Sequence, residues 1–353
     1  MSTCERVADP QNPPGTPRNL MKTQARPVAV IGGAGFIGLH VCRELRRRDI
    51  EPWIVDTHPH LERSREAARA VAGAVCPANV RDEGEVARAI SGSGITLVIN
   101  LATVSVRYSL REPHLSAANL IAVGSAVPLA CVAAGVVRYV YVSSSDIYGE
   151  AVDGPLRESN LPHPRTIYGA GKLAGEHCAA VIGIRHGLEI TIVRPFNVYG
   201  PGCHIGGTAG EAIPRWIAQV ARGESLTIHG DGAQTRDYTF VEDIARGIVD
   251  AALSNAAANS GPINLCSGVE RSVLDIARAV AQFDATKQVP MPVGGAPRPC
   301  DLRRQVGCAA RAQSTLRWEP RVSWEEGLRR TREDVLARLA GGEWADVPEK
   351  TWT

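Results

Sequence analysis

The feature that most constrains this chain is a glycine-rich turn between a short apolar run and an amphipathic segment. Gly32-Gly33-Ala34-Gly35-Phe36-Ile37-Gly38 follows Val28-Ala29-Val30-Ile31. A continuous apolar run of this length is typical of a strand buried on both faces. After the turn, apolar residues at positions 37, 41 and 45 predict a helix over 36–48. This order favours the first unit of a parallel α/β sheet.

The alternation of strand and helix continues along the first half of the chain. Apolar runs predict strands at 52–55, 96–99, 139–142 and 190–193, and periodicity predicts helices over 60–72, 83–91 and 113–134. We therefore expect an α/β fold, a doubly wound parallel sheet of the Rossmann type with right-handed crossovers. Beyond residue 193 this rhythm changes, and helices over 212–222, 272–282 and 324–339 are expected in a smaller α/β domain.

Two domains are expected between two loose tails. The predicted Rossmann domain comprises residues 27–193, with 236–265 returning to it. The predicted substrate-binding domain comprises residues 194–235 and 266–340. The proline-rich residues 1–26 contain no apolar stretch, so we expect a disordered tail there and a second one over 341–353.

Composition narrows the possible partners. With 39 basic and 37 acidic residues the formal net charge is +2, which indicates neither a nucleic-acid surface nor a polybasic membrane surface. No run of 18 apolar residues occurs, so no membrane span is expected. The nine cysteines are scattered without zinc-ligand spacing, and no His/Asp cluster suggests a metal. We expect reduced thiols in a cytoplasmic protein.

The glycine turn has the chemistry of a pyrophosphate site. Gly32 allows the tight turn, Gly35 lets the backbone approach a pyrophosphate, and Gly38 lets helix and strand pack closely. The helix that follows offers free N–H groups and a positive dipole to the anion. At the end of the second strand, Asp56 would accept hydrogen bonds from ribose hydroxyls and repel a 2′-phosphate, so NAD is favoured over NADP. An N-cap is the structural alternative for Asp56.

A tyrosine and a lysine four residues apart open a later apolar helix. The segment Tyr168-Gly-Ala-Gly-Lys172 places both side chains on one helical face. A free phenol has a pKa of about 10, but a nearby ammonium and a positive nicotinamide ring both favour the phenolate. Tyr168 could then exchange a proton with a substrate hydroxyl while a hydride moves to NAD. Taken alone, the pair also fits an ordinary amphipathic helix start.

These motifs resemble the extended branch of the short-chain dehydrogenase/reductases, the NAD-dependent nucleotide-sugar epimerase/dehydratase family typified by UDP-glucose 4-epimerase. The segment from Val142 to Gly149 resembles the family's Ser-Ser/Thr-x-x-x-Tyr-Gly motif, in which Ser144 takes the catalytic position. Residues 193–200, 230–243 and 298–301 are similar to further hallmarks of this branch. The resemblance covers about residues 27 to 335.

The resemblance implies the members of the site. The catalytic residues would be Ser144, Tyr168 and Lys172, with Asp146 as a further acid or base. NAD would be bound by Gly32, Gly35, Phe36, Ile37, Gly38, Asp56, Asn79, Val80, Leu101, Ala102, Thr103, Asn119, Tyr168, Lys172 and Pro195. A UDP- or dTDP-linked sugar would be bound by Ser144, Ser145, Asn197, Arg236, Arg298 and Asp301, with the two arginines on the diphosphate. A homodimer formed through residues 113–134 and 168–182 is also implied.

Asp146 separates the reactions that the resemblance allows, all of which begin with oxidation at carbon 4 of the sugar. We expect a 4-epimerase, in which the hydride returns to the other face and no further residue is needed. The Asp-Glu pair of a 4,6-dehydratase is replaced by Ser145-Asp146. The alternative function is a dehydratase, decarboxylase or 5-epimerase that uses Asp146 as an acid or base. The alternative without a function is an Asp146 side chain that caps nearby backbone amides.

A hypothesis from a different functional class is that the protein is a non-catalytic regulator that binds NAD on the same fold. The presence of Ser144, Tyr168 and Lys172 together argues against it, because a protein that only binds NAD does not need an activated phenol.

Overall fold

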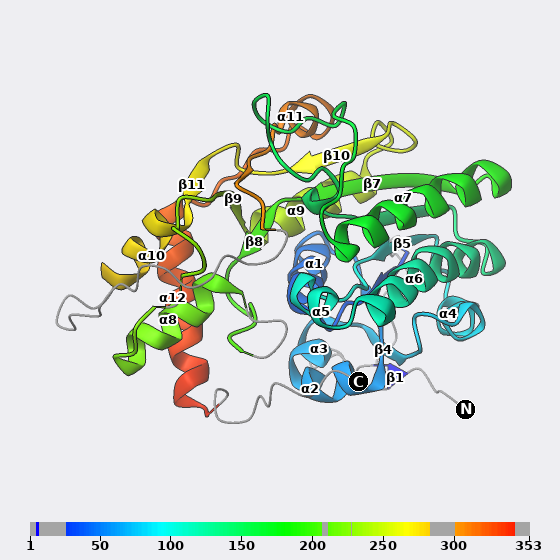
Figure 1. Ribbon diagram of the computed structural model, residues 1–353. Helices are drawn as coiled ribbons and strands as arrows, with labels where there is room; N and C mark the ends of the chain where they lie inside the picture. The colour runs from blue at the N-terminus through cyan, green and yellow to red at the C-terminus, as the bar shows by residue number, and fades with distance from the viewer. Residues whose placement is uncertain (1–4, 7–25, 207–210, 227, 283–300, 343–353) are drawn as a thin grey trace.

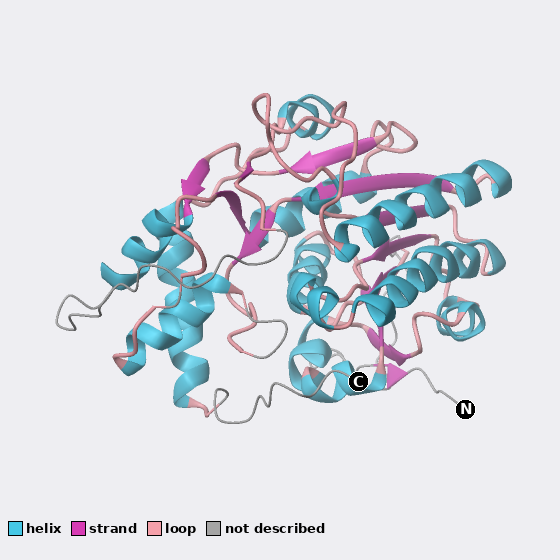
Figure 2. Cartoon of the chain, in the orientation of Figure 1, coloured by secondary structure: helices cyan, strands magenta, loops and turns pink. Residues whose placement is uncertain are grey.

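A computed structural model describes residues 5–6, 26–206, 211–226, 228–282 and 301–342. Its centre is a sheet of seven parallel strands flanked by helices (Figures 1 and 2), which confirms the predicted fold class. In spatial order the strands are β4 (Ala74–Pro77), β3 (Pro52–Asp56), β2 (Val28–Ile31), β5 (Leu97–Asn100), β6 (Arg138–Val142), β7 (Glu189–Pro195) and β10 (Pro262–Leu265). The order reverses between β2 and β5, and ligands bind at such a switch point.

Alternate side chains of each strand enter two different cores. Val28 and Val30 of β2 lie in one apolar cluster, and Ala29 and Ile31 lie in the other. The first cluster is closed by α1 (Phe36–Arg47), α3 (Arg65–Val71) and α9 (Val241–Leu253). The second is closed by α4 (Glu83–Ile90), α6 (Pro113–Ala133) and α7 (Ile167–His186). Burial on both faces explains why these strands read as continuous apolar runs.

Three local features differ from the sequence-based expectations. The helix expected over 60–72 is divided at Ser64 into α2 (His58–Arg63) and α3. Neither β4 nor the short helix α5 (Val106–Arg111) was expected, because Ala74–Pro77 has only one large apolar residue and α5 spans little more than one turn.

The structure corrects two further predictions, one about the N-terminal segment and one about the cysteines. Glu5–Arg6 forms a strand, β1, which pairs antiparallel with β4, so the segment 1–26 is not entirely a loose tail. Cys76 of β4 is disulfide-bonded, so the prediction that all cysteines are reduced is wrong there. The six other described cysteines are free thiols.

The helix α6 qualifies the expectation about membranes. Its 21 residues have a mean hydropathy of 1.8 over the most apolar window, so by length and composition it could cross a bilayer. Half of that window is buried inside the protein, where α6 packs on α7 and α4. A Cβ added to Gly124 would lie 2.7 Å from the Gly175 Cα, so glycines allow α6 and α7 to approach closely.

A second, smaller sheet stands beside the first. It comprises β8 (Asn197–Tyr199), β9 (Thr235–Phe240), β11 (Glu270–Ser272) and β12 (Arg304–Gln305). The helices α8 (Ala212–Arg222), α10 (Val273–Ala281) and α12 (Trp324–Ala340) share an apolar core with it, on the left in Figure 1. Residues 236–265 are divided: β9 lies in this sheet, whereas α9 and β10 lie with the large one. The helix α11 (Ala310–Leu316) also packs on α9 and β10.

Candidate active site

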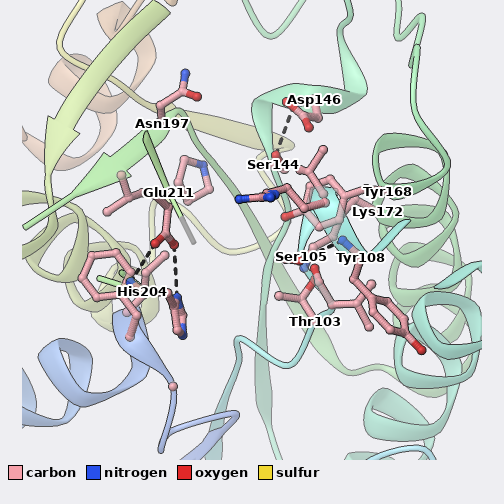
Figure 3. Close-up of a pocket in the computed structure, with 18 of the residues that line it drawn as sticks. Thr103, Ser105, Tyr108, Ser144, Asp146, Tyr168, Lys172, Asn197, His204 and Glu211 are labelled. Atoms are coloured by element: carbon pink, nitrogen blue, oxygen red, sulfur yellow. Dashed lines mark hydrogen bonds and ion pairs between the residues drawn. The ribbon is translucent and has the colours of Figure 1, made fainter. Parts of the chain in front are cut away.

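A cavity of about 1030 Å³ lies at the carboxyl ends of the large sheet and extends to the second sheet. Figure 3 shows Ser144, Tyr168 and Lys172 on one side of it and Asn197, His204 and Glu211 on the other. The predicted residues that line it are Gly32, Gly35, Phe36, Ile37, Gly38, Asp56, Val80, Leu101, Ala102, Thr103, Asn119, Ser144, Ser145, Asp146, Tyr168, Lys172, Pro195, Asn197, Arg236 and Asp301. Motifs far apart in sequence therefore share one surface.

Two glycines of the first turn have no room for a side chain. Gly32 has φ of 75°, and a Cβ there would lie 2.7 Å from the Ala102 nitrogen. A Cβ on Gly38 would lie 2.4 Å from the Gly32 carbonyl oxygen, so Gly38 lets α1 pack on the turn. With Gly35 as its N-cap and no side-chain cap, α1 directs its N-terminal amides toward the cavity. These are the features of a pyrophosphate cradle.

Asp56 is fixed at the end of β3. Its carboxylate accepts hydrogen bonds from the Ala34 nitrogen at 3.1 Å and from the Thr57 nitrogen at 2.8 Å. Although the side chain is buried, it reaches the cavity wall beside His60. The carboxylate is thus held by the backbone of the glycine turn and of its own strand. The alternative interpretation as an N-cap is not supported, because the N-cap of α2 is Thr57.

The catalytic hydroxyls meet where β6 ends and α7 begins. The Tyr168 phenol lies on the cavity wall together with Ser144 and Thr103. Burial and the nearby Asp146 charge raise the pKa of Tyr168 to about 12, and the Ser144 and Thr103 hydroxyls oppose this rise. The protein's own groups therefore keep the phenol protonated at neutral pH. A positive charge beside the ring, such as that of an oxidised nicotinamide, is needed to make it a base.

Lys172 is buried one helical turn after Tyr168. Its Nζ donates to the Val142 carbonyl oxygen at 2.9 Å and lies 6.0 Å from the centre of the Tyr168 ring. Burial lowers the pKa of Lys172 to about 7, and the charge of Glu176 opposes the shift. Glu176 is itself held by Arg194 through two hydrogen bonds of 2.8 and 2.6 Å. An amine in this setting changes protonation easily near neutral pH.

A dinucleotide fits the remaining features of this side. The Ser143 hydroxyl is buried on the cavity wall and has no hydrogen-bond partner among the described residues, as expected for a group that a ligand satisfies. Arg81, which the sequence analysis did not single out, donates to Asn79 at 3.1 Å and to Asn119 at 2.8 Å. Asn79 itself does not line the cavity, but it accepts this hydrogen bond from Arg81, which does.

The opposite wall comes mainly from the second sheet and consists of mutually bonded polar side chains. Arg236 pairs with Asp301 and donates to the Leu302 carbonyl oxygen at 2.7 Å. Asn197 donates to Gln305 at 3.2 Å, and Gln305 donates to Asp146 at 3.2 Å. Burial raises the pKa of Asp146, whereas the Gln305 hydrogen bond and the Arg236 charge lower it. The predicted Arg298 lies outside the described residues.

Several wall residues were not identified from the sequence. They comprise Arg81, Ser143, Ser105, Arg107, Tyr108, Arg111, Arg165, Glu211, His229, Gln234, Tyr238 and Gln305. Most belong to loops or short elements whose positions depend on tertiary packing. Ser105, the N-cap of α5, carried a recognisable local signal, since it accepts a hydrogen bond from the Tyr108 nitrogen at 3.1 Å.

Comparison with known proteins identifies the family of this site. Residues 28–266 match the sequence profile of the NAD dependent epimerase/dehydratase family. A UDP-glucose 4-epimerase of Mycolicibacterium smegmatis is 34% identical over 233 residues, which are 66% of this chain and 73% of that protein. UDP-glucuronic acid decarboxylase 3 of Arabidopsis thaliana is 32% identical over 208 residues, 57% of this chain and 58% of that protein. The chain spans about three fifths of the length of such decarboxylases.

The fold comparison gives the same result. The UDP-glucose 4-epimerase of Thermus thermophilus, solved in complex with NAD, has a TM-score of 0.78 and 30% identity, covering 88% of this chain and 98% of that chain. The profile match and this likeness extend over the glycine turn, the Tyr168–Lys172 pair and the strands that carry them. The chain therefore belongs to the NAD-dependent epimerase/dehydratase family, and its cofactor is NAD.

Proposed function

We propose that this protein is a 4-epimerase of a nucleotide-diphosphate sugar. The observation that carries the proposal is the joint placement of the Tyr168 and Ser144 hydroxyls and the Lys172 amine between a dinucleotide cradle and a polar wall that includes Arg236. Such a cavity presents one sugar hydroxyl to an acid/base pair. The likeness to UDP-glucose 4-epimerases over most of their length supports the same assignment.

The reaction follows from the residues in place. NAD supplies a reversible hydride acceptor when bound. Tyr168 takes the proton of the carbon 4 hydroxyl, and Ser144, which lines the cavity beside the phenol, holds the reacting oxygen against it. The positive charges of Lys172 and the cofactor favour the phenolate during this step. Once the ketose has turned over, return of the hydride to the opposite face of carbon 4, with Tyr168 giving the proton back to the carbon 4 oxygen, would complete the inversion, so no net reduced cofactor leaves.

The substrate is proposed to be UDP- or dTDP-linked. Arg236 supports this because a guanidinium fork binds phosphate oxygens bidentately, and its present partner Asp301 is a carboxylate that occupies the same fork. Asn197, on the same wall, offers its amide oxygen as an acceptor to a sugar hydroxyl, because its Nδ2 group already donates to Asp237 and Gln305.

A second candidate function is elimination or decarboxylation that uses Asp146. It is favoured by one observation: the Asp146 carboxylate lines the cavity near the Tyr168 phenol, whose pKa it raises. The likeness to UDP-glucuronic acid decarboxylases supports this alternative.

Product mass separates the two candidates. Purified protein would be incubated with UDP-glucose, UDP-glucuronic acid, UDP-N-acetylglucosamine and dTDP-glucose, and the products analysed by mass spectrometry and proton NMR. A product of unchanged mass with an inverted carbon 4 signal is expected. Loss of water or carbon dioxide from a substrate would reject the epimerase in favour of the Asp146 reaction.

We further propose a homodimer formed through α6 and α7, which lie side by side (Figure 1). The large apolar side chains Leu115 and Ile121 of α6 and Val181 and Ile184 of α7 are exposed on these helices. Two copies of this face would bury them in a four-helix arrangement. Sedimentation at micromolar concentration should give a dimer, and a monomer would reject this assembly.

A further inference from the structure

We propose that Gln305 is a positioning residue, whose side-chain amide holds the Asp146 carboxylate with one oxygen directed toward the sugar end of the cavity. The proposal rests on the proposed function, since it needs a sugar beside Asp146. Gln305 is 1% exposed and comes from β12, whereas Asp146 belongs to the 3-10 turn Ser145–Ile147 after β6. The two residues are 159 positions apart and meet only at this wall.

The orientation of the Gln305 amide is determined by its neighbours. The Asn197 Nδ2 group donates to the Asp237 carbonyl oxygen at 3.3 Å, and a carbonyl oxygen only accepts. The same Nδ2 group donates to the Gln305 Oε1 atom at 3.2 Å. The Gln305 Nε2 group must therefore face Asp146, and it donates to Oδ1 at 3.2 Å. A reversed amide would place two donors against each other.

This contact leaves the second oxygen of Asp146 to the cavity. Among the described residues, Gln305 provides the one side-chain hydrogen bond to the carboxylate. Asp146 lines the cavity together with Tyr168 and Gln305, so its other oxygen is available to a sugar hydroxyl or to a proton. The backbone of the turn is fixed separately, because the Asp146 nitrogen donates to the Ser144 Oγ at 3.1 Å. Gln305 thus determines the rotation of the side chain.

The hydrogen bond also affects the charge of Asp146. Burial raises the pKa of the carboxyl group, and the donation from Gln305 opposes this, with a smaller contribution from the positive charge of Arg236. The other titratable group that faces it is the Tyr168 phenol. A neutral amide that donates one hydrogen bond favours the ionised carboxylate without adding a charge next to the sugar.

The test uses Gln305→Leu, which removes the amide at nearly constant volume, and Gln305→Glu, which replaces the donor by an acceptor. Titration of the Asp146 carboxyl would be followed by NMR of ¹³C-labelled aspartate and assigned by its loss in Asp146→Asn. The pKa of Asp146 should rise by about one pH unit in Gln305→Leu and by more in Gln305→Glu, whose added carboxylate also repels the Asp146 charge. Gln234→Leu is the matched control, because Gln234 is also buried on this wall and donates to the His229 carbonyl oxygen instead.

A double-mutant cycle adds the functional readout. Gln305→Leu should lower kcat/KM for the nucleotide sugar about tenfold in the wild-type background and less than twofold in Asp146→Asn, because Gln305 acts through Asp146. Equal losses in both backgrounds, or an unchanged Asp146 titration, would overturn the proposal. If the wild-type protein converts no nucleotide sugar, the proposed function fails, whereas the titration still reports on the Gln305 contact.

Discussion

The two walls of the cavity are built in different ways. The cofactor wall consists of strand ends, a helix N-terminus and a glycine turn, so backbone groups and the residues next to them do most of the binding. The opposite wall consists of Asn197, Arg236, Asp301 and Gln305, which hold one another through side-chain hydrogen bonds. Contacts made by backbone groups persist when most side chains are substituted, because they depend on the fold. Contacts made by side chains are lost or altered by a single substitution. We therefore expect the chemistry to be fixed by the first wall and the sugar by the second.

Removing the phenol should have the largest effect. Tyr168→Phe should lower turnover by about 10³-fold or more, because general acid–base catalysis contributes factors of about 10² to 10⁴ and no other described hydroxyl has the same partners. Steady-state assays with the substrate found above would measure this. NAD affinity and the unfolding transition should stay near wild type, as should turnover in Tyr108→Phe, a phenol on the same cavity. Unchanged turnover in Tyr168→Phe would remove the proposed proton exchange.

Acid should lower the free energy of unfolding by disturbing a contact between α1 and the segment that follows β8. The Nε2 group of His40 in α1 donates to the Pro201 carbonyl oxygen, just after β8, at 2.8 Å, and burial lowers the pKa of His40 to about 4. The unfolded chain takes up this proton near pH 6.5, so the contribution is complete above pH 6.5 and disappears as the pH falls to 4. The free energy of unfolding should fall by about 3 kcal/mol across this window.

Denaturant titrations at several pH values measure this effect. His40→Gln keeps an N–H donor but cannot titrate, so its free energy of unfolding should depend less on pH between 6.5 and 4. His114→Gln, at an exposed position, should behave as wild type. The same pH dependence in His40→Gln as in the wild type would contradict the assignment.

Asp56→Asn should weaken the cofactor wall by a smaller amount. Loss of a charge-assisted hydrogen bond to ribose is expected to cost about 2 kcal/mol, which lowers NAD affinity roughly 30-fold. The preference for NAD over NADP should also narrow, because repulsion of a 2′-phosphate is lost. Calorimetric titration with both nucleotides tests this, with the exposed Glu62→Gln of α2 as control. If Asp56→Asn bound NAD with the same affinity as the wild type, the ribose would have to lie away from Asp56.

The smallest effect is expected from a substitution of Arg236 on the wall opposite the cofactor. Arg236→Lys keeps the charge but loses the fork, so the KM for the nucleotide sugar should rise about fivefold, or about 1 kcal/mol, with kcat nearly unchanged. Arg303→Lys is the matched control, since Arg303 is 63% exposed and pairs with Asp231. A fall in kcat without a change in KM would show that Arg236 acts on the reacting atoms instead.

The same contrast explains what could be read from the sequence. Gly32, Gly38 and Asp56 act through their own stretch of backbone, and the spacing of Tyr168 and Lys172 is local to one helix, so each leaves a pattern in the chain. Gln305 and Arg81 leave none, because their partners are brought to them by the pairing of β12 with β9 and by the packing of α6.

Gly169, immediately after the catalytic tyrosine, has a consequence for how this active site could be altered. A Cβ at this position would lie 2.6 Å from the Asp146 carbonyl oxygen, so the start of α7 rests directly on the turn that carries the carboxylate. The close approach of the Tyr168 backbone to the turn that carries Asp146 therefore depends on the lack of a side chain at position 169, whereas Gln305 orients the carboxylate itself. An engineer who wants a different product from this scaffold should leave that contact intact and redesign the facing residues.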